Sequence, residues 1–508
     1  MASPVSAALQ FLRDRLPGRV ITPDADTSAP ASASAADFTT LTNQPWSSTC
    51  WQAPAAYILP ESSSEVATAL SILKQSGIKF VVRSTGHNPN PGFSSIGDEG
   101  VVIDLAKLQR REIVEVNEVT AAESGIGCGN GKIARVGAGN RWGVVYDWLE
   151  KQGLSAIGGR DPGVGMGLLV GGGLGAVPNL HGVPSNGLRG VEIVLSDGRI
   201  VNANADENAD LYRALKGGGS NFGIITRFDL ATHPLIPLQY SITLYSPSDY
   251  TNINRATVQL QEDMESEPRI GTFTNFNSAF VAVGFITAGD SASSSQVESE
   301  GGSGTVTEAF KPFESLDSKM MDACPTTNGT LGSLAKVMAH AAGDEKKKYV
   351  RTLTTTPSAD LYNDAYNAWR AALDTIPKDA VLHYTIQPVG STCVREAEKA
   401  GGNILGLKAV AQCWWVFTIE WPRESTPEDD AAARNAVTCL VEKVRNAAKS
   451  RDHLLPYLCA TFASSDQGVL SSYGAQNIEI MKAVSRKYDP DGVFQSQQYG
   501  GFLLRDLE

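Results

Sequence analysis

Near the start of the chain, hydrophobic residues follow a helical period and then gather in a short, mostly apolar run. Residues 62–77 place apolar side chains at helical spacing between a capping box, formed by Ser62 and Glu65, and a terminal Gly77. The apolar run 78–82 follows directly. This pattern predicts a helix that leads into a strand, whose end delivers the loop that comes next.

The same change of period recurs further along the chain. Residues 141–152 predict a helix that Gly153 ends, and residues 154–157 predict a short strand. Alternating residues at 191–201, interrupted by Asp197-Gly198, predict a hairpin with a tight turn. Because helix and strand signals are mixed in this region, we expect an α+β fold.

Longer strands distinguish the middle of the chain. Alternation in 413–421 predicts a sheet with one face directed inward. Residues 289–304, rich in Ser, Gly and Glu, predict a loop. The other elements predicted here are strands at 280–286, 381–389 and 412–421 and a helix at 360–373.

Composition and pattern together divide the chain. Residues 24–36 are rich in Ala, Ser, Asp and Pro, which predicts a flexible segment before ordered packing begins near Trp46. A helix face at 478–484 predicts a last packed segment. We predict an arm at 1–45, a first domain at 46–234, a middle domain at 235–449 and a return to the first domain at 450–508.

The overall composition indicates a protein with more than one domain. The chain has 508 residues, of which 42% are hydrophobic, so it can bury a sizeable core. Its formal net charge is −12, and it has no stripe of Lys and Arg with interleaved aromatic residues. Because nucleic-acid binding requires neutralisation of phosphates, we expect no nucleic-acid partner.

The cysteines and the N-terminal residues bear on the compartment. The cysteines form no C-x-x-C pair and no zinc spacing, which favours a reducing compartment and predicts no metal site. Residues 1–20 lack the uninterrupted apolar core of a secretory signal, and no later run is apolar for long enough to span a bilayer. We therefore expect a cytoplasmic protein with no membrane partner.

Three glycine-rich segments carry the candidate chemistry, and they are 83–93, 158–175 and 217–225. In the first, small residues after Arg83 allow backbone N–H groups to converge on phosphate oxygens, and His87 adds an imidazole. The glycine density of the other two implies that the backbone passes close to something flat or charged. Neither of these two has the order of a Rossmann dinucleotide motif or of a P-loop, so both common nucleotide sites are disfavoured.

The order and spacing of these segments resemble a known family. Together with 60–76, 101–105, 196–199 and 487–495, they are similar to the flavoproteins that share the FAD-binding fold of vanillyl-alcohol oxidase and p-cresol methylhydroxylase. Within that superfamily the resemblance is to the fungal relatives of berberine bridge enzyme. It implies a two-part FAD-binding domain with an inserted antiparallel-sheet substrate domain.

The resemblance also implies which residues hold FAD. The histidine that matches His87 is commonly attached to the 8α-methyl of the flavin, and a neutral imidazole is a suitable nucleophile for that bond. Because no cysteine lies between Cys128 and Cys324, we expect a single covalent link. The expected FAD-binding residues are Arg83, Ser84, Thr85, Gly86, His87, Asn88, Gly92, Gly159, Val164, Gly165, Gly167, Gly171, Gly172, Gly175, Gly223 and Ile225.

The expected oxidation requires a catalytic base, unless the usual reaction is altered in this chain. Hydride transfer from an alcohol or an amine requires a group that takes the proton. Fungal relatives often carry Tyr-x-Asn shortly before the last helix, where this chain reads Cys459-Ala460-Thr461. Because neither a thiol nor an alcohol easily replaces a phenol as a base, the candidates by residue type are Tyr384, Tyr457 and Tyr499.

Two functions follow as hypotheses. The first is an FAD-dependent oxidase that takes hydride from a small-molecule substrate, such as an alcohol, an amine or a secondary-metabolite intermediate, and passes the electrons to molecular oxygen. The second, motivated by the change at Cys459 to Thr461, is a flavin-containing scaffold that folds an intermediate for a non-redox cyclisation. Oxygen consumption during turnover distinguishes the two.

Overall fold

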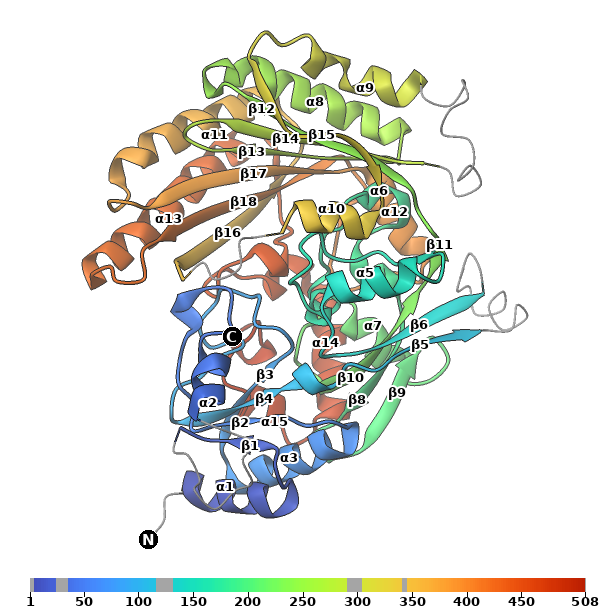
Figure 1. Ribbon diagram of the computed structural model, residues 1–508, viewed down its shortest axis with the longest axis vertical. Helices are drawn as coiled ribbons and strands as arrows, with labels where there is room; N and C mark the ends of the chain where they lie inside the picture. Colours follow the sequence, from blue (N-terminus) through green and yellow to red (C-terminus); the bar gives the residue numbers. More distant parts are fainter. Residues whose placement is uncertain (1–3, 24–34, 116–130, 290–303, 340–344, 508) are drawn as a thin grey trace.

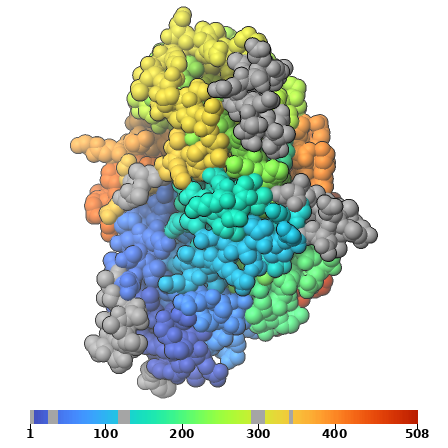
Figure 2. All heavy atoms as spheres, turned by 45° about the vertical axis from the view of Figure 1, so that its right-hand side comes forward, coloured from blue at the N-terminus to red at the C-terminus, as the bar shows by residue number. Residues whose placement is uncertain are grey.

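The chain folds into a lower part, built from both ends of the sequence, and an upper part, built from its middle (Figure 1). This computed structural model describes residues 4–23, 35–115, 131–289, 304–339 and 345–507. Figure 2 shows the same division on the surface, with blue and cyan residues below and yellow and orange residues above. The lower part is therefore completed only after the chain has returned from the upper one.

A small four-stranded sheet lies at the base of the lower part. Helix α3 (Ser63–Ser76) begins at Ser62, whose side chain accepts a hydrogen bond from the Glu65 N–H, and ends at Gly77 with a φ of 66°. The helix leads directly into strand β3 (Lys79–Arg83), as the sequence predicts. The sheet has the order β1-β2-β4-β3, formed by β1 (Val20–Ile21), β2 (Ala56–Ile58), β4 (Gly100–Asp104) and β3 (Lys79–Arg83).

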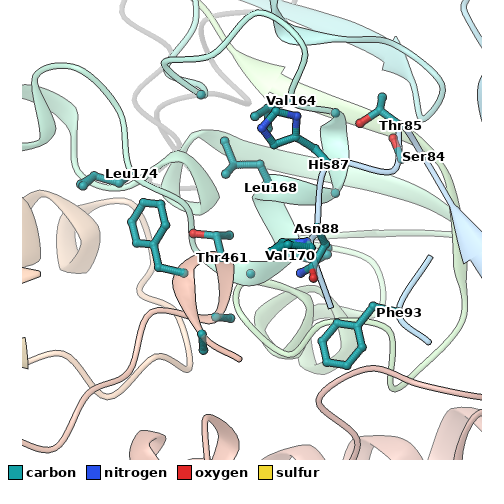
Figure 3. Close-up of a pocket in the computed structure, with 18 of the residues that line it drawn as sticks. Ser84, Thr85, His87, Asn88, Phe93, Val164, Leu168, Val170, Leu174 and Thr461 are labelled. Carbon is teal, nitrogen blue, oxygen red and sulfur yellow. The ribbon is translucent and has the colours of Figure 1, made fainter. Parts of the chain in front are cut away.

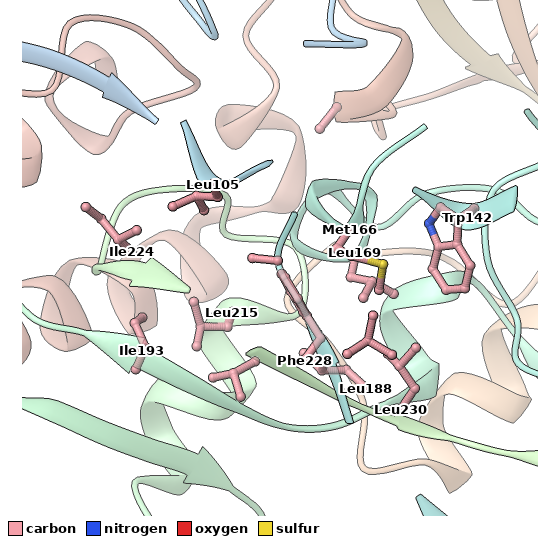
Figure 4. Packing of buried hydrophobic residues seen from close by; sticks show 14 of the residues in the cluster. Leu105, Trp142, Met166, Leu169, Leu188, Ile193, Leu215, Ile224, Phe228 and Leu230 are labelled. Carbon is pink, nitrogen blue, oxygen red and sulfur yellow. The ribbon is translucent and has the colours of Figure 1, made fainter. Parts of the chain in front are cut away.

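A second sheet, antiparallel throughout, completes the lower part. Its order is β5-β6-β10-β8-β9, formed by β5 (Arg111–Glu115), β6 (Lys132–Gly137), β10 (Ile224–Ala231), β8 (Leu188–Val194) and β9 (Ile200–Asn204). The predicted hairpin is the β8–β9 pair. Figure 4 shows how Leu188, Phe228 and Leu230 from this sheet pack close to Met166 and Leu169, all of them buried. The second glycine segment is thereby attached to the core.

The upper part is one antiparallel sheet with helices on one face (Figure 1). Its order is β15-β12-β14-β13-β17-β18-β16-β19, with β12 (Leu238–Tyr245), β13 (Ile270–Phe276), β14 (Val281–Ala288), β15 (Lys319–Gly329), β16 (Lys347–Thr355), β17 (Val381–Val389), β18 (Gln412–Trp421) and β19 (Leu454–Leu455). The covering helices are α8 (Tyr250–Ser266), α9 (Gly304–Glu314), α11 (Ala359–Ala372) and α13 (Pro427–Ser450). We call the opposite face, which is turned toward the lower part, the inner face.

Strict alternation separates the two faces of the upper sheet. On the helix side, Tyr384 and Ile386 of β17 join Trp415 and Phe417 of β18 in an apolar cluster with the helices. Residues between them, such as Thr385, point the other way, because neighbours along a strand face opposite sides. The helix-side cluster is thus separate from the residues of the inner face that line the cavity.

The last segment of the chain returns to the edge of the small sheet. It carries α14 (Ala475–Tyr488) and α15 (Val493–Ser496). The Phe80 N–H donates to the Gln497 carbonyl at 3.1 Å, and the Tyr499 N–H donates to the Phe80 carbonyl at 2.8 Å. These bonds fix the C-terminal segment beside the loop that carries His87.

Shorter elements complete the fold. Near the N-terminus lie α1 (Pro4–Arg15) and α2 (Ala35–Thr42), and further along come α5 (Trp142–Glu150), β7 (Leu154–Ser155), α6 (Pro178–His181), α7 (Ala209–Leu215), β11 (His233–Pro234), α10 (Leu331–Val337) and α12 (Ser391–Lys399). The expectation that ordered packing begins near Trp46 is wrong, because Leu12 and Leu16 of the N-terminal segment are buried in the core of the lower part. Of the predicted flexible segment, 24–34 lies outside the described residues.

Candidate functional site

A cavity of about 730 Å³ lies between the lower part and the inner face of the upper sheet. All three glycine segments contribute to its wall, and so do strands β13, β17 and β18. Volumes of this size are typical of pockets that hold a cofactor or a drug-sized ligand. The topology therefore brings together residues that are far apart in the sequence.

Most of the predicted FAD-binding residues line this cavity. They are Ser84, Thr85, Gly86, His87, Asn88, Gly159, Val164, Gly165, Gly167, Gly171, Gly223 and Ile225. Gly172 and Gly175 follow the same segment just behind the wall, and Gly92 packs against the ring of Tyr499. The structure thus brings the three segments together and leaves four of the predicted residues outside the lining, including Arg83.

Arg83 supports the fold beneath the cavity. Its side chain is buried and makes an ion pair with Asp104 at 2.6 Å, and it also donates to the Leu41 carbonyl at 2.8 Å. Arg83 and Asp104 are register partners in the parallel strands β3 and β4. The guanidinium is thereby engaged within the protein, so it does not join the loop residues that face the cavity.

The His87 loop is braced on both sides. The Ser84 hydroxyl donates to the Ala138 carbonyl at 2.6 Å, and the Asn88 side chain accepts from the Asn90 N–H at 2.9 Å. A side chain at Gly165 would place its Cβ 2.7 Å from Ser84 Oγ, so only glycine allows the second segment to come this close to the loop. These contacts hold the loop in one conformation, and the side of the loop that faces the cavity remains accessible.

His87 projects into the cavity beside Val164 and Leu168 (Figure 3). Its ring stacks on the indole of Trp46, with centroids 5.2 Å apart and planes 10° apart. The Lys348 ammonium lies 5.0 Å from the centroid of the same indole. The orientation of the imidazole is therefore set by residues outside its own loop.

Polar side chains from strand β17 face the cavity from above. His383, Thr385 and Gln387 line it at alternate positions. The Asn275 side-chain amide donates to Thr385 Oγ1 at 2.7 Å and lies 3.2 Å from His383 Nδ1. The amide also approaches the Tyr384 carbonyl at 3.4 Å, which only an N–H can satisfy. Asn275 of β13 thus connects His383 and Thr385 on the inner face.

Arg160 projects into the cavity from the second glycine segment. Its guanidinium donates to the Gln387 side-chain carbonyl across the junction of the two parts. Burial lowers the pKa of Arg160 to about 10. The group still carries a positive charge at neutral pH.

Comparisons with known proteins bear on this site. An FAD binding domain model matches residues 54–204. An FAD-dependent monooxygenase of Arthrobotrys oligospora is 34% identical over 467 residues, which cover 92% of this chain and 85% of that protein. A bifunctional solanapyrone synthase of Alternaria solani is 30% identical over 466 residues, which cover 90% of this chain and 83% of that protein.

Solved structures share the fold. The glucooligosaccharide oxidase of Acremonium strictum, described as having a 6-S-cysteinyl, 8α-N1-histidyl FAD, aligns with a TM-score of 0.74 and 17% identity. The alignment covers 98% of this chain and 99% of that one. The chain belongs to the FAD-linked oxidoreductases that include the fungal FAD-dependent monooxygenases. The predictions of this family and of its α+β fold, with a two-part FAD-binding domain and an inserted antiparallel sheet, are confirmed.

The residues of this FAD-linked oxidoreductase fit its cofactor. A Cβ placed on Gly167 would meet no atom within 4 Å, so this glycine presents bare backbone to the open cavity. A Cβ on Gly163 would lie 3.7 Å from His87 Nδ1, which puts the imidazole against the same wall. A flat ring can therefore approach the backbone and the histidine together.

The three tyrosines predicted as bases lie outside the cavity lining of the flavoprotein. Tyr384 stacks on Phe276 on the helix side of the sheet, and burial raises its pKa well above the usual value. Tyr457 is buried beside Trp414, and burial likewise raises its pKa. Tyr499 is 40% exposed at the surface, where the charge of Glu99 raises its pKa.

Sequence reasoning named Gln387 as a candidate on its strand but missed His383 and Thr385 on the same inner face. His383 precedes Tyr384 directly, and the alternation of β17 showed that the two residues face opposite sides without showing which side is the cavity. Tyr473, which also lines the cavity, carried no signal in the sequence beyond its residue type.

Two further searches cover the described part of the chain. No group of three or more His, Cys, Asp and Glu side chains is placed to hold a metal ion there. Within the same residues, every helix is too short or too polar to cross a membrane.

Proposed function

We propose that the enzyme oxidises a small organic molecule, which the cavity holds between the glycine wall and the inner face of the upper sheet, and passes the electrons to oxygen to give peroxide. When bound, FAD supplies a hydride acceptor. The observation that carries the proposal is that His87 shares one cavity with the polar residues of β17. Cofactor and substrate sites then adjoin, as hydride transfer requires.

The residues on one side of the cavity would hold FAD, and those on the other side would bind the substrate. FAD would be held by residues 84–88, by the wall from Gly159 to Gly171 and by Gly223 and Ile225, with Arg83, Gly92, Gly172 and Gly175 supporting them from behind. On the substrate side, His383, Thr385 and Gln387 line the cavity and supply the polar groups that orient a substrate oxygen.

We further propose that His87 forms the single covalent link to FAD. Its imidazole faces the cavity, and no cysteine is among the described residues of the lining, so a second link through sulfur has no partner there. The test is to precipitate the protein with acid and measure the flavin that remains with it. Wild-type protein should retain flavin on the peptide that contains His87, whereas His87→Ala should release all of it.

Anaerobic spectroscopy tests the reaction. Addition of a substrate should bleach the absorbance of the flavin, and admission of air should restore it with one peroxide per product. Because the relative from Arthrobotrys oligospora is named a monooxygenase, turnover under ¹⁸O₂ is the matching control. Incorporation of ¹⁸O into the product, with little peroxide formed, would show that the enzyme inserts oxygen into its substrate.

The non-redox cyclisation stays the second candidate. The residues Ala460 and Thr461 line the cavity at the place where a phenol would be expected, and the relative from Alternaria solani is named a bifunctional synthase. Product formation without bleaching and without oxygen uptake would favour this function. One oxygen consumed per product would exclude it.

A further inference from the structure

Arg160 brings a positive charge to the boundary between the two parts of the enzyme. It lies on the second glycine segment and contacts Gln387 on the inner face of the upper sheet. Gln387 is itself buried, and its amide nitrogen lies 3.5 Å from the Trp414 carbonyl. The glutamine is thus oriented to hold one edge of the guanidinium.

The charge of Arg160 is not neutralised by a neighbouring carboxylate. In the described ranges of the chain, no Asp or Glu makes an ion pair with it, and Gln387 is its one hydrogen-bond partner. The adjacent Asp161 directs its Oδ1 to the Gly163 N–H at 2.6 Å, and its charge acts on Arg141. A guanidinium carries five N–H donors, so most of those of Arg160 remain for a ligand.

Arg141 provides an internal comparison. It also belongs to the glycine region, but its Nη1 donates to the Gly163 carbonyl at 2.7 Å; burial lowers its pKa, and the charges of Asp104 and Asp161 oppose that shift. A partly buried cation without such a counter-charge is costly, because desolvation is not compensated. A ligand that brings its own negative charge removes that cost.

Apolar side chains surround the remainder of this side of the cavity. Ile242, Phe273, Val350 and Val416 come from four strands of the upper sheet and all line it. Such a surface suits a largely apolar molecule. One fixed cation within it then selects for one acidic group on that molecule.

We propose that Arg160, oriented by Gln387, is the binding site for an oxyanion of the substrate, so that the enzyme acts on an apolar organic molecule with one carboxylate, phenolate or enolate group. This inference rests on the proposed function, because it gives the substrate class of the same cavity. The guanidinium binds the acidic oxygen and thereby fixes which carbon of the substrate faces the cofactor wall. Arg160 acts here as a specificity-determining residue.

The test compares two probes of the same shape. Calorimetric titration of the FAD-loaded enzyme with 1-naphthoate should give saturable binding at least tenfold tighter than with the neutral 1-naphthamide. Arg160→Gln should weaken naphthoate binding about tenfold to hundredfold, the loss expected for a charge-assisted hydrogen bond, and leave naphthamide binding unchanged. Arg160→Lys should give an intermediate affinity, since it keeps the charge without the planar donors.

Controls separate the alternatives. Arg395→Gln removes an exposed positive charge of α12 outside the cavity lining and should leave both affinities unchanged. Equal affinity of the wild-type enzyme for the two probes, or no saturable naphthoate binding, would overturn the proposal without any variant. A lower flavin midpoint potential in Arg160→Gln with the preference for naphthoate intact would assign the charge to the cofactor instead. A colourless protein that still prefers naphthoate would contradict the flavin function and leave the anion site standing.

Discussion

Trp46 helps to orient His87. Its indole stacks on the imidazole, and the Lys348 ammonium of strand β16 lies over the same indole. Lys348 is buried and lies 4.0 Å from Glu420. A residue of the lower part and a strand of the upper part therefore contribute together to the position of the histidine, and the covalent link proposed for His87 requires a fixed ring.

We expect Trp46→Ala to reduce covalent attachment of flavin. Loss of the stack frees the imidazole to leave its position, so less than about half of the bound flavin should remain with acid-precipitated protein. The matched control is Trp51→Ala, which removes an indole of the same segment that packs under Arg423. Full attachment in Trp46→Ala would show that the loop orients His87 alone.

Adjacent substitutions on β17 test the assignment of its two faces. His383→Ala should lower kcat/KM by about tenfold to hundredfold with flavin content unchanged, because a hydrogen bond to the substrate oxygen is lost. Tyr384→Phe should keep kcat/KM within about twofold, since its hydroxyl lies on the helix side among aromatic rings. Steady-state kinetics of both variants with the same substrate tests this assignment. A large loss of kcat/KM in Tyr384→Phe but not in His383→Ala would instead support Tyr384 as the base.

At the scale of elements, the approach of the second glycine segment to the His87 loop decides whether the cavity forms. Gly165→Ala should lower stability by about 1–3 kcal/mol, because the new Cβ would lie 2.7 Å from the side chains of Ser84 and Thr85. Gly167→Ala should leave the melting temperature of flavin-free protein unchanged, because its Cβ meets no atom within 4 Å.

Both glycine variants should nevertheless contain less flavin. Gly165→Ala distorts the wall, whereas Gly167→Ala adds a methyl group to the space that the cofactor needs. Thermal unfolding and flavin absorbance together separate these causes. Normal flavin content in Gly167→Ala would contradict the placement of FAD against this segment.

The elements themselves could largely be predicted from the sequence. The bounds of β17 and β18 follow from alternation, and α3 follows from its cap at Ser62 and its terminal Gly77, since these signals are local. The N-terminal helix α1 was not predicted from the sequence. The segment 24–36 that follows it is rich in small polar residues, and the burial of α1 depends on packing against α3.

The site could be predicted only in part. His87 and the glycine segments stand out as short motifs, but the stack on Trp46, the ion pair of Arg83 and the contact between Arg160 and Gln387 join residues distant in sequence. Such contacts are set by tertiary packing, for which one sequence gives no periodic signal.

At the scale of the whole molecule, a histidine pair lies where the chain passes from the lower to the upper part. His181 of α6 and His233 of β11 stack with centroids 3.8 Å apart. Burial, followed by the charges of His181 and Arg189, lowers the pKa of His233 to about 3, and burial lowers the pKa of His181. The folded enzyme therefore keeps both rings neutral near pH 7.

This pair should make stability depend on pH. In the unfolded chain these histidines bind protons near their ordinary pKa of about 6.5. In the folded chain the pKa of His233 is about 3, so the ring stays neutral until the pH is much lower. The stability that is present above about pH 6.5 is therefore lost as the pH falls toward 3. Between pH 7 and pH 5, we expect the melting temperature of His233→Gln to fall less than that of the wild-type enzyme. Parallel losses would contradict this role, and melts at pH 8, where both rings are neutral, provide the reference.

The two faces of the upper sheet also bear on how such enzymes diversify. The helix-side residues form a core cluster of their own, so exchanges at the intervening positions that line the cavity can change ligand choice without loss of that cluster. Variation confined to Asn275, His383, Thr385, Val416 and Thr418 gives a small set of positions for altering the catalysed reaction. A scaffold organised in this way lets a lineage acquire new chemistry by a few substitutions on alternate residues.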